Sequence, residues 1–213
     1  STSLARETDS LETLLKGCIG IVCELTSWSI GHAYLPRNAD GNPELIPTGI
    51  WNSDDKHSLT ELRSVTQAHW VRNGVDIPSL ILKTKNPQWI SDIDTEIQGH
   101  RLEALQRLGV RSACGFPVVI RDELVAVLEF FAFERLERDD ALLAVLRSVG
   151  EQIGRAIERR RAEDALHAAW GRQMHRAGDQ RHVGARLARG AGNGETHLAR
   201  RQVGDATHRV DGL

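Results

Sequence analysis

Apolar residues recur at steps of three and four near both ends of the chain, which is the spacing of one face of a helix. The pattern predicts a helix over residues 8–25 and one long helix over residues 139–169. Asp9 or Ser10 is suited to cap the first helix, and Asp139 places negative charge at the start of the second. Helical segments are therefore expected to begin and end the folded part of the chain.

Strand patterns occupy the middle of the chain. Segments 28–35 and 45–51 are separated by a stretch dense in turn formers, and they form a predicted hairpin in which Pro36 ends the first strand. Segments 112–120 and 123–133 form a second predicted hairpin with a tight turn. Their nearly continuous apolar runs indicate that both faces of this hairpin are covered.

Short elements separate the two hairpins. Helices are predicted over residues 59–70, capped by Ser58, and over residues 100–108, ended by Gly109, with a short strand over residues 87–90. The order is helix, hairpin, helix, short strand, helix, hairpin, long helix. This order predicts an α+β fold, with an antiparallel sheet flanked by the N- and C-terminal helices.

Composition narrows the class of protein. The 213 residues include 40% hydrophobic and 26% charged residues, with a formal net charge of −2. This is an ordinary globular composition without general affinity for polyanions, so we expect no nucleic acid partner. No apolar run is long enough to cross a bilayer, and we expect no membrane partner. Three sparse cysteines, at 18, 23 and 114, do not make a disulfide framework, which favours the cytoplasm.

Four segments together resemble GAF domains of bacterial sensor histidine kinases. Trp28-Ser29-Ile30-Gly31-His32-Ala33-Tyr34-Leu35, followed by Pro47-Thr48-Gly49-Ile50-Trp51, resembles their first hairpin. Leu108-Gly109-Val110-Arg111-Ser112-Ala113-Cys114-Gly115-Phe116-Pro117-Val118 and Leu124-Val125-Ala126-Val127-Leu128-Glu129-Phe130-Phe131 resemble two later strands. Ile153-Gly154-Arg155-Ala156-Ile157-Glu158-Arg159-Arg160-Arg161-Ala162-Glu163 resembles their exit helix. The resemblance covers roughly residues 8–168.

The resemblance implies a sheet of about six strands, with terminal helices packed on one face and a ligand pocket on the other. It also implies a sensory domain that drives an output module, such as the kinase of a two-component system. The heptad-like seam of the exit helix, together with the resemblance, favours a homodimer through the terminal helices. The expected division is a boundary segment or linker at 1–7, the GAF-like domain at 8–158 and a signalling-helix linker at 159–170.

Residues 171–213 differ in composition from the rest of the chain. Arg and His become frequent, Lys disappears and strong periodicity is lost. We expect this segment to be a disordered tail or a non-native one, produced by a slipped coding frame or by cloning. A basic tail that binds nucleic acid is a weaker alternative, because aromatic residues are missing after Trp170.

The candidate ligand pocket comprises Trp28, His32, Trp51, Trp89 and Phe116. His32 could contact a ligand or haem, and the tryptophans could form an aromatic pocket, but each could equally be an ordinary core residue. No metal site is predicted, and the residues require no cofactor.

Two further residues are candidates for special chemistry. Cys114 is the best candidate for a reactive thiol, but alternation puts it on the face of Ser112, Phe116 and Val118, which suggests burial. Glu129 lies inside an apolar strand and needs a partner, and a structural role is favoured.

The sequence therefore predicts an intracellular sensory GAF domain. It would bind a small ligand or a neighbouring domain and signal through its C-terminal helix to a histidine kinase. No nucleophile–base set or phosphate loop is present, so we expect the domain itself not to be an enzyme. The alternatives are a thiol-based redox sensor or reductase using Cys114, and a free-standing ligand-binding module.

Overall fold

A computed structural model describes residues 2–39, 42–53, 59–72 and 74–170. The chain divides into two compact units, residues 1–161 and 162–213. In the second unit the described residues, 162–170, are helical. The predictions for residues 171–213 and for the Ser58 cap fall outside the described residues.

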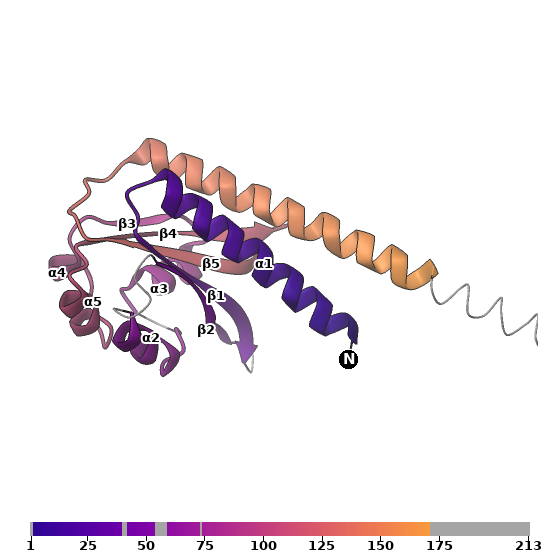
Figure 1. The fold of residues 1–213 in the computed structure, drawn as a ribbon, viewed down its shortest axis with the longest axis horizontal. Helices are drawn as coiled ribbons and strands as arrows, with labels where there is room; N and C mark the ends of the chain where they lie inside the picture. Colours follow the sequence, from indigo (N-terminus) through magenta and orange to yellow (C-terminus); the bar gives the residue numbers. More distant parts are fainter. Residues whose placement is uncertain (1, 40–41, 54–58, 73, 171–213) are drawn as a thin grey trace, which may run out of the picture. The chain divides into compact units, whose positions relative to one another are not determined.

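The first unit contains an antiparallel sheet with the strand order β2-β1-β5-β4-β3 (Figure 1). This gives five strands in the described part of the chain, where about six were expected. The strands are β1 (Ile30–Ala39), β2 (Asn42–Ser53), β3 (Gln88–Ile90), β4 (Ser112–Ile120) and β5 (Glu123–Ala132). Both predicted hairpins are confirmed, and β1 and β5 bring them together at the centre of the sheet.

Pro36 does not end the first strand, contrary to the prediction, since β1 continues to Ala39. The pairing of β1 with β5 stops at Tyr34, whereas its pairing with β2 continues through Pro36. At Pro36 the strand therefore has a neighbour on one side only. A missing backbone N–H is tolerated at such an edge.

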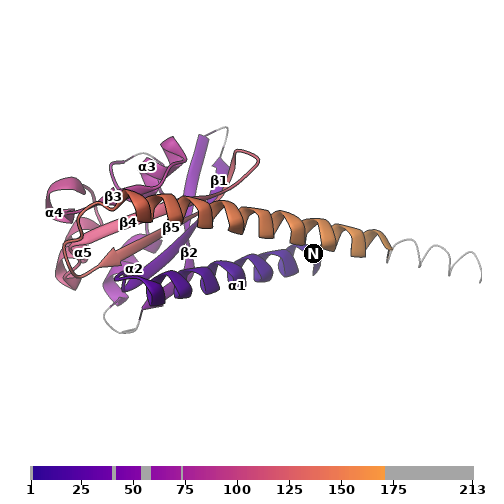
Figure 2. The same cartoon turned by 90° about the horizontal axis from the view of Figure 1, so that it is seen from above.

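Two helices cover one side of the sheet, which we call the helical side. They are α1 (Thr2–Leu25) and the helix that begins at residue 140, of which residues 140–161 belong to the first unit. Figures 1 and 2 show them side by side over the sheet, α1 in indigo and residues 140–161 in orange. α1 begins earlier than the predicted residue 8. Leu15, Ile19, Phe116, Phe130 and Leu146 are among the buried residues of the core beneath them.

Four short helices cover the opposite side, which we call the distal side (Figure 1). They are α2 (Thr60–Gln67), α3 (Ile77–Thr84), α4 (Ile93–Glu96) and α5 (Leu102–Leu108). Asp76 caps α3 by accepting a hydrogen bond from the Ser79 amide at 3.1 Å, and Gly109 ends α5 in the left-handed conformation, as predicted. The second core cluster lies between these helices and the sheet.

Glycines let the helix of residues 140–161 approach β4 closely. A side chain added at Gly150 would collide with the carbonyl oxygen of Pro117, and one added at Gly154 would collide with that of Val119. A strand carbonyl cannot move aside as a flexible side chain can. The helix therefore rests directly on the backbone of β4, one strand away from β5.

Candidate functional site: a buried polar cluster on the distal side

A buried ion pair lies at the centre of the distal side. Glu129 of β5 is 1% exposed and Arg101, just before α5, is 4% exposed. The two terminal nitrogens of Arg101 donate to the two carboxylate oxygens of Glu129 at 3.2 and 2.8 Å. This two-point geometry is the strongest form of an Arg–carboxylate contact, and the partner expected for Glu129 is therefore present.

Neighbouring groups complete the ion pair. The Tyr34 hydroxyl donates to Glu129 at 3.3 Å, and Asp76 lies 4.0 Å from Arg101. Burial raises the pKa of Glu129, and the charge of Arg101 opposes that rise. The forked contact favours the ionised pair at neutral pH. Burial likewise raises the pKa of the Tyr34 hydroxyl well above its ordinary value, so Tyr34 stays protonated as a donor.

His32 lies beside this ion pair and is fully buried. Its ring stacks on Trp51 with a centroid distance of 3.9 Å and meets Tyr34 edge-on at 4.5 Å. Burial, together with the charge of Arg101, lowers the pKa of His32 to about 3. The imidazole is therefore neutral at physiological pH. Its Nε2 lies 3.1 Å from the Thr48 carbonyl oxygen, which can only accept, so Nε2 carries the proton.

α2 contributes polar groups to the same region. The Gln67 amide donates to the Thr48 carbonyl at 2.7 Å, and the Arg63 guanidinium carbon lies 5.6 Å from the Trp51 ring centre. At the edge of the cluster the rings of His69 and His100 lie tilted against each other with a centroid distance of 3.7 Å. Burial and the neighbouring His69 lower the pKa of His100. The cluster therefore combines cations, imidazole rings and aromatic rings.

The five residues predicted to line one pocket do not share one side of the sheet, so the single-pocket prediction is wrong. His32 and Trp51 pack on the distal side. Trp28, Trp89 and Phe116 belong to the core of the helical side, where Trp28 and Trp89 meet edge-on at 5.0 Å. Trp28 lies before the start of β1, so the alternation of side chains along β1 does not determine which side of the sheet Trp28 faces. Its face could not be deduced from strand periodicity.

Several residues of the distal cluster were not predicted from the sequence, among them Tyr34 and Arg101, which both contact Glu129. Tyr34 falls in the predicted strand over residues 28–35, and Arg101 falls in the predicted helix over residues 100–108, but neither is predicted to belong to a site. The only signal was Glu129, whose position in an apolar strand required a partner. Nothing in local sequence distinguishes Arg101 from the other arginines as that partner.

Cys114 and Cys18 are not arranged as reactive thiols. Cys114 is fully buried in the core of the helical side, as its strand alternation predicted. Burial raises its pKa well above the ordinary value, and burial raises that of Cys18 to about 11. Both thiols are thus protonated at neutral pH, which counts against a thiol-based function for Cys114.

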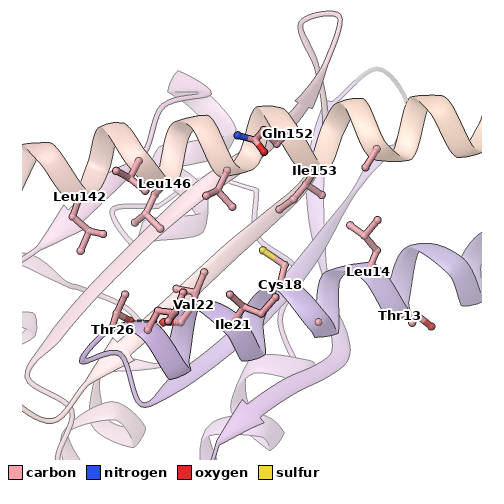
Figure 3. Close-up of a pocket in the computed structure, with 15 residues that line it drawn as sticks. Thr13, Leu14, Cys18, Ile21, Val22, Thr26, Leu142, Leu146, Gln152 and Ile153 are labelled. Carbon is pink, nitrogen blue, oxygen red and sulfur yellow. Dashed lines mark hydrogen bonds between the residues drawn. The ribbon is translucent and has the colours of Figure 1, made fainter.

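An apolar groove of about 650 Å³ lies between α1 and residues 140–161 on the helical side (Figure 3). Leu14, Cys18 and Val22 of α1 face Leu146 and Ile153 of the second helix across it. Three large apolar residues on the groove are strongly exposed: Leu25 at 80%, Ile21 at 57% and Val145 at 56%. We call this feature the helical groove.

Two kinds of feature are absent from the described ranges of the chain. No group of three or more His, Cys, Asp or Glu residues there could hold a metal ion. None of the helices in those ranges has the length and apolar character needed to cross a membrane.

The strand order, the paired terminal helices and the buried polar cluster define an α+β domain with two different sides. Residues 8–158 match the family model for the GAF domain. The chain belongs to the GAF domain family, whose members are regulatory and sensory ligand-binding modules. No curated protein matches the chain.

Solved structures share this fold at low sequence identity. A domain assigned to a two-component sensor histidine kinase protein from Sinorhizobium meliloti 1021 is 14% identical with a TM-score of 0.54, covering 73% of this chain and 97% of that one. The GAF domain of a phosphoenolpyruvate-protein phosphotransferase from Coxiella burnetii is 15% identical with a TM-score of 0.54, covering 77% and 95%. A type II free methionine-R-sulfoxide reductase from Thermoplasma acidophilum is 10% identical with a TM-score of 0.52, covering 72% and 96%.

Proposed function

We propose that this GAF domain binds a small ligand or a neighbouring domain through the distal side and signals through its C-terminal helix to a histidine kinase. In this proposal the domain is cytoplasmic, acts as a homodimer and performs no catalysis itself. The structural similarity to a domain of a sensor histidine kinase protein supports the choice of a kinase as the output module.

One observation carries the proposal: the C-terminal helix rests on the sheet backbone behind the buried ion pair. Glu129 pairs directly with Gly115 of β4, and Gly150 and Gly154 contact the carbonyl groups of Pro117 and Val119 further along β4. A displacement of Glu129 by a ligand would therefore reach the helix through one strand. Signalling then requires only that the ligand has different affinities for two positions of the helix.

The helical groove supports the homodimer. Ile21 and Val145 expose apolar surface on the two helices that form it. In a twofold dimer the same patch covers itself, so a second copy would supply two more helices with matching apolar faces. Because the two helices lie side by side, the product would be a four-helix bundle.

The dimer can be tested with neighbouring substitutions on one helix. Val145→Glu puts a charge into the helical groove, whereas Ala144→Glu adds the same charge at an exposed position that does not line it. We expect light scattering to give a dimer for the wild type and Ala144→Glu, and a monomer for Val145→Glu. A monomeric wild type, or a dimer that Val145→Glu leaves intact, would refute this interface.

The proposed kinase output can be tested by sequencing the source gene. Translation of all three forward frames across residues 160–213 and beyond should reveal a continuation into a helix with a phospho-acceptor histidine. If the present frame stands and no such helix follows, the kinase output is wrong and a free-standing binding module becomes the better account.

A further inference from the structure

The buried polar atoms on the distal side that lack a hydrogen-bond partner include Arg101 Nε, which belongs to the ion pair with Glu129, and three further atoms: His32 Nδ1, Arg63 Nε and Thr66 Oγ1. Leaving a buried donor or acceptor unpaired destabilises the folded state, and native proteins rarely do so. Three such atoms in one region therefore point to a partner that is not part of the protein chain.

The three side chains come from β1 and α2, which meet near Trp51 and Thr48. The His32 ring lies 3.9 Å from the Trp51 ring, and the Arg63 guanidinium carbon lies 5.6 Å from the centre of that same ring. Thr66 follows Arg63 by about one turn of α2 and therefore lies on the same helix face. Gln67 and His32 both donate to the Thr48 carbonyl, which places this end of α2 over β1 and β2.

The chemistry of the three atoms defines the missing partner. His32 Nε2 carries the ring proton, so Nδ1 is a neutral acceptor that needs a donor. Arg63 Nε is a donor on a permanent cation and prefers an anionic oxygen. The Thr66 hydroxyl can act as a hydrogen-bond donor or as an acceptor. Arg101, whose charge acts on His32, adds a second cation beside the site.

We propose that His32, Arg63 and Thr66 bind a small carboxylate that also carries a hydroxyl group. The carboxylate accepts from Arg63 Nε, the ligand hydroxyl donates to His32 Nδ1, and Thr66 supplies the third contact. This inference rests on the proposed function, since it assigns a ligand class to the distal side.

The probes are three hydroxycarboxylates of increasing length: glycolate, 3-hydroxypropionate and 4-hydroxybutyrate. Each has two matched controls, the carboxylate without the hydroxyl (acetate, propionate, butyrate) and the corresponding diol without the charge. Isothermal titration on the full chain should give saturable binding for at least one hydroxycarboxylate. Both of its controls should bind at least tenfold more weakly, and the nitrogen resonance of His32 Nδ1 should shift on binding.

Variants on α2 identify the site. Arg63→Gln and the isosteric Thr66→Val should each weaken binding of that probe at least tenfold. Arg147→Gln removes the same charge from an exposed position on the helical side and should leave the affinity unchanged. Near-UV circular dichroism confirms that each variant is folded. If Arg63→Gln does not fold, Thr66→Val and the His32 resonance decide the test.

The inference is overturned if no hydroxycarboxylate binds the folded wild type, if the unsubstituted acids bind equally well, or if folded Arg63→Gln and Thr66→Val keep wild-type affinity. In the first case ordered water satisfies the three atoms. Light scattering on the same samples separates this failure from that of the proposed function. If the protein is a dimer but binds none of the probes, only the proposed ligand class is wrong. If the protein is a monomer, the proposed dimer interface is wrong.

Discussion

Burial of a neutral histidine should make this domain sensitive to acid well above the range in which carboxylates titrate. His32 has a pKa of about 3 in the folded chain, against an ordinary value of 6.5, because of its burial and the nearby charge of Arg101. The unfolded chain therefore binds a proton as the pH falls through 6.5, and the folded chain does not. Stability is lost as the pH falls between those two values.

The size of the effect follows from the two pKa values. One pKa unit corresponds to about 1.4 kcal/mol, so His32 alone should lower the free energy of unfolding by about 2 kcal/mol between pH 7 and pH 5. Near pH 3 the loss reaches about 4 kcal/mol. Single domains are stable by about 5–15 kcal/mol, so the loss at pH 5 is measurable and the loss at pH 3 is comparable to the total.

Urea unfolding at pH 7 and pH 5 measures this difference for the wild type and for His32→Phe. Phe keeps a ring against Trp51 but cannot take a proton. Between the two pH values, the free energy of unfolding should fall by about 2 kcal/mol less in the variant than in the wild type, with unchanged m-values. His167→Gln, at an exposed helical position, should behave as the wild type does.

Other titrating groups contribute equally to wild type and variant, so the comparison isolates His32. Equal losses in the wild type and His32→Phe would refute the assignment of His32 as a neutral, buried ring. A shift of the His32 imidazole resonances near pH 6.5 in the folded protein would refute it independently.

Three further predictions concern other parts of the domain. Gly154→Ala should lower the free energy of unfolding in urea by about 1–3 kcal/mol, because the new methyl group meets the Val119 carbonyl. This loss should exceed the gain from the better helix propensity of Ala. An unchanged urea midpoint would contradict the contact. Arg121 and Asp122 have positive φ values of 47° and 67°, a conformation that Asn and Gly adopt more readily. The double substitution Arg121→Asn, Asp122→Gly should therefore raise the free energy of unfolding by about 1 kcal/mol. A lower melting temperature would contradict this turn conformation. Cys114 should resist Ellman's reagent at pH 8 in the native protein and react in guanidinium chloride; rapid native reaction would restore the thiol-based alternative.

Features set by neighbouring residues could be predicted from the sequence. The hairpin of β4 and β5 follows from two apolar runs around a short turn, and the buried face of Cys114 follows from strand alternation. The end of α5 at Gly109 follows from the tolerance of glycine for left-handed backbone. The need of Glu129 for a partner follows from the cost of burying a charge.

Features that depend on long-range packing were decided only by the tertiary structure. Arg101 lies 28 residues from Glu129, and only the tertiary fold, which brings the start of α5 to β5, makes it the partner. The division of Trp28 and Trp51 between opposite sides of the sheet depends on where the chain enters β1. Pro36 remains within β1 because β5 has already stopped pairing there. Each of these outcomes arises from contacts between distant segments, whereas periodicity and turn chemistry act within a few residues.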